Sequence, residues 1–216
     1  MKLPFARLFP RNRWVSQDGI SKREYASYRD YVIHQKAKLP KIHNLGKKRE
    51  VLKAALRERL PHIPEIARGR SVLCLGARRG AECEAFIERG AFAIGIDLNP
   101  GVDNCLVVVG DFHNLQYADH SVDCVYTNSL DHVFDLDRVL GEIRRVLKLD
   151  GIFIAEIVRG SRDSNGRNPG KYASCWWNRS DDLLDVIADS GFEPESKADF
   201  VEPWNGIQVV FRIVAT

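Results

Sequence analysis

Residues 71–82, SVLCLGARRGAE, decide the fold of this chain together with AFAIGIDLNP at 91–100. The apolar run 71–75 has strand composition and ends at Gly76. A short loop then leads to Gly80, after which a helix is predicted. A second strand, 92–96, ends on Asp97. Strand, glycine turn, helix, strand and acid form one βαβ unit, which usually holds a nucleotide-like ligand.

Strands and helices continue to alternate after this unit. Further strands are predicted over 105–109 and 122–127 and from Gly151, and an amphipathic helix over 136–147. Such alternation predicts a parallel sheet with helices on both faces.

The end of the chain has a different pattern. Ser180 is predicted to cap a helix over 181–190. Strands at 192–201 and 207–214 are joined by a short segment with the turn signal Asn205-Gly206, so they should pair antiparallel.

The first 70 residues have too little apolar content to fold alone. Residues 1–20 look irregular, and a capping box at Ser21 and Glu24 predicts a helix towards Leu39, before Pro40. A second helix is predicted over 47–60, with its inward face formed by Val51, Leu52, Ala55 and Leu56. We expect an N-terminal extension, 1–70, packed on the main domain, 71–216, where it could act as a lid.

Composition indicates a globular protein without a membrane span. Of 216 residues, 44% are hydrophobic and 28% charged, and no apolar run approaches the roughly 20 residues that cross a bilayer. The N-terminus lacks the apolar core of a secretory signal, although its lack of acids before Asp18 leaves a transit peptide as an alternative. Five scattered cysteines without a CxxC pair argue against disulfides or zinc and favour the cytoplasm.

Charge divides the chain into two parts. Residues 1–70 hold 18 Lys or Arg against 6 Asp or Glu, whereas residues 71–216 hold 14 against 23. A basic segment on an acidic body could dock on its own domain, an anionic substrate, nucleic acid or a membrane surface.

Five stretches, in order and spacing, carry a family resemblance. They read VLCLGARRG at 72–80, GID at 95–97, GDF at 110–112, SVDCVY at 121–126 and EIRRVLKLDG at 142–151. Over about 71–216 the chain resembles the class I S-adenosylmethionine-dependent methyltransferases whose first motif reads VLDLGCGTG. This resemblance implies a Rossmann-like, doubly wound α/β fold: a mostly parallel seven-stranded sheet with a C-terminal antiparallel hairpin and, here, a helical N-terminal extension.

The resemblance also implies S-adenosylmethionine as the cofactor, S-adenosylhomocysteine as the product, and no metal. The two loop glycines let the backbone approach the methionine part, and Asp97 would accept hydrogen bonds from the ribose hydroxyls. Asp111 would accept a hydrogen bond from the adenine amino group, with Phe112 against the adenine ring. Asp97 and Asp111 could instead cap local turns. The cofactor-binding residues expected are Gly76, Ala77, Arg78, Gly80, Glu82, Asp97, Leu98, Asp111, Phe112, Asn128 and Ser129.

The first motif departs from the family pattern at two positions. Cys74 stands where the family usually has an acid, and Arg78 stands for the middle glycine. The Arg78 guanidinium could pair with the cofactor carboxylate. Glu82 could contact the cofactor amine or steer Arg78, or it could be a solvated acid in the first helical turn.

A redox dinucleotide fold is the main competitor. Its fingerprint needs a third glycine, whereas this loop reads GARRG, and the terminal hairpin also disfavours it.

Asp131 and His132 follow the fourth strand and are the candidate catalytic pair, with His132 as general base. Similar sequences often have Glu-His here without a catalytic role. No Asn/Asp-Pro-Pro-Tyr/Phe motif follows this strand, which argues against a methylase of exocyclic amines in DNA.

The acceptor is the least defined part of the prediction. Aromatic candidates for stacking on a sugar or planar acceptor are Tyr28, Tyr172, Trp176 and Trp177, which could equally pack a helix. We expect a small or saccharide-like acceptor. The alternatives are RNA or another polyanion bound by the basic segment, and a non-catalytic protein that only binds the cofactor. The oligomeric state stays open.

Overall fold

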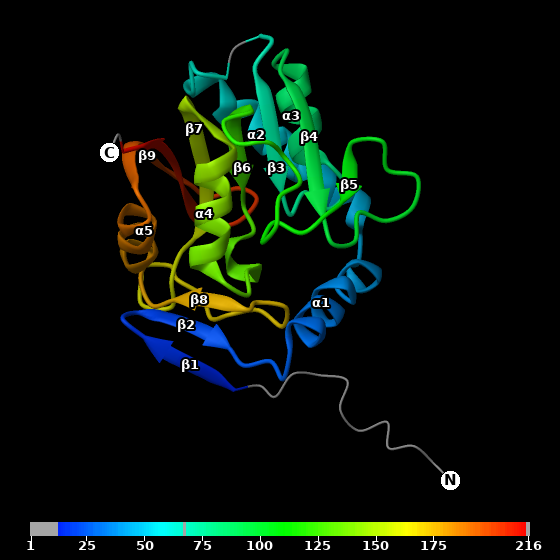
Figure 1. Ribbon diagram of the computed structural model, residues 1–216. Coiled ribbons are helices and arrows are strands. Elements are labelled where there is room, and N and C mark those ends of the chain that lie inside the picture. Colours follow the sequence, from blue (N-terminus) through cyan, green and yellow to red (C-terminus); the bar gives the residue numbers. More distant parts are fainter. Residues whose placement is uncertain (1–12, 67, 215–216) are drawn as a thin grey trace.

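The computed structural model describes residues 13–66 and 68–214 and has a seven-stranded sheet at its centre (Figure 1). The strand order is β5-β4-β3-β6-β7-β10-β9. The bounds are β3 Ser71–Leu75, β4 Phe92–Asp97, β5 Val107–Val109, β6 Val122–Thr127, β7 Leu147–Val158, β9 Phe192–Phe200 and β10 Gly206–Ile213. Strands β5, β4, β3, β6 and β7 run parallel, whereas β10 is antiparallel to both of its neighbours. The predicted doubly wound fold with a C-terminal antiparallel hairpin is confirmed.

Strand order reverses between β3 and β6, and this point positions the site. From β3 the chain first adds β4 and β5 on one side, then returns to add β6 and β7 on the other. The loops after β3 and β6 therefore diverge to opposite faces. In open α/β sheets the resulting crevice, at the carboxyl ends of the strands, is where ligands bind.

Helices cover both faces of the sheet (Figure 1). Helices α2, Leu45–Arg59, and α3, Ala81–Glu88, pack on one face, with α4, Leu136–Val146, and α5, Ser180–Asp189, on the other. Helix α4 follows its sequence pattern closely, because the buried side chains are Leu136, Val139, Leu140, Ile143 and Val146. Each fully buried aliphatic side chain contributes about 1.5–3 kcal/mol of transfer free energy.

The N-terminal segment differs from the prediction. Residues 14–23 form a hairpin of β1, Trp14–Gln17, and β2, Ile20–Arg23, and β2 pairs antiparallel with β8, Cys175–Trp177 (Figure 1). The predicted irregular structure is therefore wrong for residues 14–20, while residues 1–12 lie outside the described part. The three-stranded sheet β1-β2-β8 joins the N-terminal segment to the main domain.

Helix α1 spans Tyr28–Lys36, so the predicted start after Ser21 is wrong. Ser21 is committed to β2, and Ser27 is the N-cap, with its Oγ accepting from the backbone N–H of Asp30 at 3.2 Å. Short 3-10 turns follow at η1, Leu39–Lys41, and η2, Leu60–His62.

Three smaller expectations are also corrected. Val51 on α2 is exposed rather than inward, because the buried face there is carried by Ala55 and Leu56. Ser180 is the first residue of α5 rather than its cap, and its hydroxyl donates to Asp163 instead. Strand β7 begins at Leu147, four residues before Gly151, because Leu147 already pairs with β6.

No helix in the ranges 13–66 and 68–214 is long and apolar enough to cross a bilayer.

Candidate functional site

The loop after β3 is held in a conformation that needs glycine at its start. Gly76 has φ +68°, and a Cβ there would lie 2.7 Å from the Ser129 Oγ. Gly80, with φ +80°, caps α3. Arg78 has φ +49°, a left-handed conformation that costs a residue with a Cβ roughly 1–2 kcal/mol. Glycine would adopt this conformation without that cost, so the loop holds Arg78 at a position that favours glycine.

Asp97, the last residue of β4, fixes this loop against the next one. Its Oδ2 accepts from the backbone N–H of Arg78 at 3.0 Å, and its Oδ1 accepts from that of Asn99 at 2.7 Å. Each carboxylate oxygen has further lone pairs, and Asp97 lines the cavity at this edge of the sheet.

The cavity is lined both by residues predicted to bind the cofactor and by residues that were not predicted to do so. Its lining is Tyr31, Gln35, Lys38, Leu39, Gly76, Arg78, Asp97, Leu98, Asn99, Phe112, Ser129 and His132. Ala77 and Glu82 line a smaller neighbouring pocket that shares Arg78. Gly80 lies behind the loop, against Leu106 and Val107.

Helix α1 covers the cavity with residues that the motif analysis missed. Tyr31 and Gln35 are spaced i and i+4 and so lie on one side of α1, and Lys38, at i+7, follows the end of the helix. That spacing is the signal that could have identified them. The Tyr31 side chain is fully buried, and its hydroxyl has no hydrogen-bond partner among the described residues.

Asp111 lies beside the cavity and is already bonded. Its Oδ1 accepts from the backbone N–H of His113 at 2.9 Å and lies 2.8 Å from His113 Nδ1, while the Tyr28 hydroxyl donates to Oδ2. Burial acts to raise the pKa of the Asp111 carboxyl, but these bonds together lower it below its ordinary value. Phe112 stacks on His113 with ring centroids 5.0 Å apart.

The residues after β6 form the opposite wall. His132, in η3, Leu130–His132, lies 2.8 Å from the carbonyl oxygen of Tyr172 through Nδ1. Because a carbonyl only accepts, Nδ1 carries the proton and Nε2 presents a lone pair. Lys38 Nζ donates to this Nε2, and an Asp131 oxygen lies 3.6 Å from it. Burial, opposed by Asp131 and reinforced by Lys38, lowers the pKa of His132 to about 4.

Asn128 lines neither the cavity nor the neighbouring pocket, and it contacts Glu82. Its Nδ2 donates to Glu82 Oε1 at 3.1 Å, and behind it the Tyr126 hydroxyl donates to Glu156 at 2.9 Å. Burial raises the pKa of Glu82 to about 7, although Arg78 and Asn128 act in the opposite direction. Glu82 is therefore a buried acid rather than the solvated helix acid considered as the alternative.

The aromatic substrate candidates are not brought together. Trp176 and Trp177 are buried in β8, and their rings stack on each other 5.4 Å apart. The Trp177 Nε1–H donates to the Val158 carbonyl at 2.9 Å. Neither ring presents a face to the cavity lining, so both residues pack the core. Tyr172 stacks on His34, and Tyr28 packs against Phe134.

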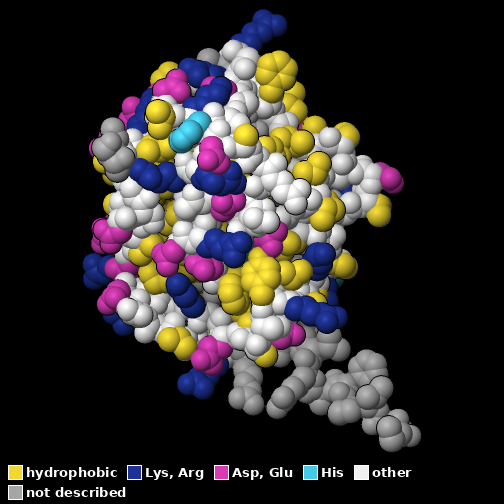
Figure 2. Space-filling view, viewed as in Figure 1, with side chains coloured by type: hydrophobic (Ala, Val, Ile, Leu, Met, Phe, Trp, Pro, Cys, Tyr) yellow, Lys and Arg dark blue, Asp and Glu magenta, His cyan; other side chains and the backbone are white. Residues whose placement is uncertain are grey.

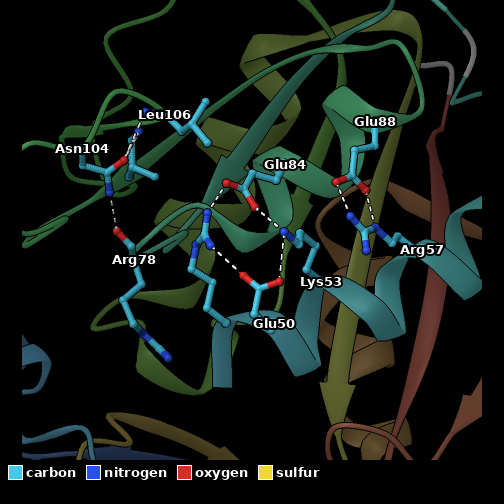
Figure 3. Close-up of polar contacts among 10 residues, drawn as sticks. Glu50, Lys53, Arg57, Arg78, Glu84, Glu88, Asn104 and Leu106 are labelled. Carbon is cyan, nitrogen blue, oxygen red and sulfur yellow. Dashed lines mark hydrogen bonds and ion pairs between the residues drawn. The ribbon is translucent and has the colours of Figure 1, made fainter. Parts of the chain in front are cut away.

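The basic charge of α2 is largely used inside the molecule. Figure 3 shows Lys53 paired with Glu84 on α3 and Arg57 paired with Glu88. Arg49 also pairs with Glu84, and Lys53 Nζ lies 3.0 Å from Glu84 Oε2. These pairs hold α2 against α3. In the same view the Arg78 guanidinium has no contact drawn, and it makes no hydrogen bond or ion pair with the described residues.

Comparisons with known proteins agree with this geometry. Residues 73–155 match a family model described as a methyltransferase domain. The chain is 35% identical to a demethylmenaquinone methyltransferase of Thermobifida fusca over 38% of this chain and 41% of that protein. It is 28% identical to malonyl-[acyl-carrier protein] O-methyltransferase 1 of Coxiella burnetii over 67% of this chain and 49% of that protein. It thus spans less than half the length of these relatives.

A solved structure shares the fold. The Burkholderia thailandensis 1,6-didemethyltoxoflavin-N1-methyltransferase, solved with 1,6-didemethyltoxoflavin and S-adenosylhomocysteine bound, superposes with a TM-score of 0.68. The match covers 92% of this chain and 97% of that chain at 16% identity.

Proposed function

We propose that the chain is a class I S-adenosylmethionine-dependent methyltransferase and that it transfers the methyl group of this cofactor to a small-molecule acceptor. The observation that carries the proposal is the cavity at the carboxyl edge of the sheet, where Asp97, Gly76 and Ser129 meet. Three motif residues from three different strand ends line one space, as a nucleoside-binding crevice requires.

The residues of the cavity fit the cofactor. The Tyr31 hydroxyl is a buried polar atom without a partner among the described residues, so it can bond a ligand. Asp97 has lone pairs left for the ribose hydroxyls. Gly76 keeps the floor open, since a side chain there would meet Ser129. Asp111 can serve the adenine amino group beside its bond from Tyr28, because a carboxylate oxygen accepts more than one hydrogen bond.

When bound, the cofactor supplies an electrophilic methyl group on a sulfonium. The chain binds and orients it: Asp97 holds the ribose and the Arg78 guanidinium pairs with the carboxylate. Glu82 and Asn128 lie together where they can contact the amine of the methionine part. Helix α1 covers the cavity and excludes water, which strengthens each of these interactions.

A small acceptor is favoured over a polyanion. The cations of α2 pair with α3, and Figure 2 shows Lys and Arg interspersed with Asp and Glu on the face viewed. The relatives named above act on demethylmenaquinone, on malonyl-[acyl-carrier protein] and, in the solved structure, on 1,6-didemethyltoxoflavin. We place the acceptor beside Ser129 and His132, under α1.

Titration calorimetry with S-adenosylhomocysteine tests the proposal. Wild-type protein should bind it, and Asp97→Ala should weaken binding more than tenfold because charge-assisted hydrogen bonds to the ribose are lost. Asp185→Ala, an exposed carboxylate on α5, is the matched control and should bind normally. Absence of wild-type binding at hundreds of micromolar ligand would refute the cofactor assignment. Binding without turnover on an acceptor panel would favour a binding protein.

A further inference from the structure

Lys38 is a cation in the wall of the cavity without a counterion among the described residues. It follows α1, and its Nζ makes one hydrogen bond, to Nε2 of His132. No carboxylate of the described residues lies within ion-pair distance of it. Holding an ammonium away from water without an anion is costly, so such a lysine tends to lose its proton.

The contact with Lys38 also prevents His132 from acting as the general base. Nδ1 of His132 donates to the Tyr172 carbonyl and Nε2 accepts from Lys38, so neither ring nitrogen is available to a substrate. A neutral Lys38 behaves differently. Its amine donates one hydrogen to His132 and still has a lone pair to direct into the cavity.

On this geometry we propose that Lys38 is the general base of the reaction and that His132 is its positioning residue. The inference rests on the proposed function. The acceptor is then a hydroxyl or amine that must lose a proton. The proton of the acceptor passes to Lys38 Nζ. The lone pair of the acceptor atom forms a bond to the methyl carbon, the carbon–sulfur bond breaks, and its electron pair stays on sulfur. The lysine ends as an ammonium and the product thioether is neutral, so charge balances.

The charges around Lys38 support this role. Burial, followed by repulsion from Arg78, lowers the pKa of Lys38 to about 8, while Asp131 and Asp97 raise it and Arg167 lowers it further. His132, which Lys38 Nζ contacts, is neutral because its own pKa is about 4. Roughly a tenth of Lys38 is therefore neutral at pH 7, and a bound sulfonium should increase that fraction.

The test measures Lys38 without an acceptor. Trace acetylation of the wild-type protein across pH, quantified by mass spectrometry, gives the midpoint for each lysine. The exposed Lys47 and Lys48 serve as internal references. Lys38 should titrate near 8 in the ligand-free protein. Its midpoint with S-adenosylmethionine bound should lie about one unit below its midpoint with S-adenosylhomocysteine bound, because the two ligands differ by the methyl group and its positive charge.

Two results would overturn the proposal. One is a Lys38 midpoint equal to those of Lys47 and Lys48. The other is an identical Lys38 midpoint with both ligands, which would place Nζ away from the methyl group. Since wild-type binding of S-adenosylhomocysteine is measured first, a failure of the proposed function is recognised separately.

A binding measurement distinguishes two roles of Lys38, that of a general base and that of a residue that holds the cofactor carboxylate. Lys38→Met should bind S-adenosylhomocysteine within about threefold of the exposed control Lys36→Met. A tenfold loss for Lys38→Met, with affinity for 5′-methylthioadenosine unchanged, would show that Lys38 holds the carboxylate and would overturn the proposal. The two ligands share the adenosine part, so a folding defect would weaken both.

Discussion

Replacing Glu82 by Gln should stabilise the protein at alkaline pH. The Glu82 side chain is buried in the first turn of α3, and burial raises its pKa from 4.5 to about 7. In the unfolded chain the carboxyl returns to its ordinary value. A raised folded-state pKa means that the stabilising contribution is present below about pH 4.5 and is lost as pH rises through 7.

The magnitude follows from the difference between the two states. A shift of about 2.5 units at roughly 1.4 kcal/mol per unit gives an upper limit of about 3 kcal/mol above pH 8. The amide introduced by Glu82→Gln would carry no charge and could still accept the 3.1 Å hydrogen bond from Asn128 Nδ2. The variant should therefore match the wild type near pH 4 and exceed its stability by about 1–3 kcal/mol near pH 8.5.

Urea unfolding at the two pH values measures this difference. Glu84→Gln is the matched control, two residues along the same helix, and it should lose roughly 0.5–1 kcal/mol because its pairs with Arg49 and Lys53 are removed. The reasoning fails if Glu82→Gln is no more stable than the wild type near pH 8.5, or if its gain is the same at both pH values. If Glu82 also contacts the cofactor amine, the stabilised variant should bind S-adenosylhomocysteine less tightly.

Two other substitutions test the local structure. Asp123→Asn should destabilise the protein by roughly 2–4 kcal/mol near neutral pH, because the carboxylate accepts from Lys148 Nζ at 2.8 Å and from the Ser71 hydroxyl at 2.6 Å. Burial acts to raise the pKa of Asp123, but these bonds hold it well below its ordinary value. The loss of stability in the variant should therefore diminish as pH falls. A loss of stability that is independent of pH in urea unfolding would contradict this. Arg78→Gly should raise stability by roughly 0.5–1 kcal/mol, since glycine accepts φ +49° freely; calorimetry should also show weaker S-adenosylhomocysteine binding, and unchanged affinity would remove Arg78 from the site.

The sequence by itself was sufficient to predict the sheet and the residues at its carboxyl edge. The pattern of apolar strands, glycine turn and terminal acid is local, because strand period and backbone freedom are properties of neighbouring residues. The terminal hairpin followed from the Asn205-Gly206 turn for the same reason. Gly76, Asp97 and Ser129 could therefore be assigned to one cavity from their positions at the ends of predicted parallel strands.

Only the tertiary structure decided what covers that cavity. Ser21 and Glu24 have the pattern of a capping box, yet Ser21 lies in a strand, β2. This strand forms because β8, more than 150 residues later, provides backbone hydrogen-bond partners. This pairing delays α1 until Tyr28, and α1 then brings Tyr31 and Lys38 over the strand ends. Pairing between distant segments and the burial of charge depend on the whole chain. The residues at the strand ends are thus readable from motifs, whereas the position of Lys38 in the wall of the same cavity is visible only in the folded protein.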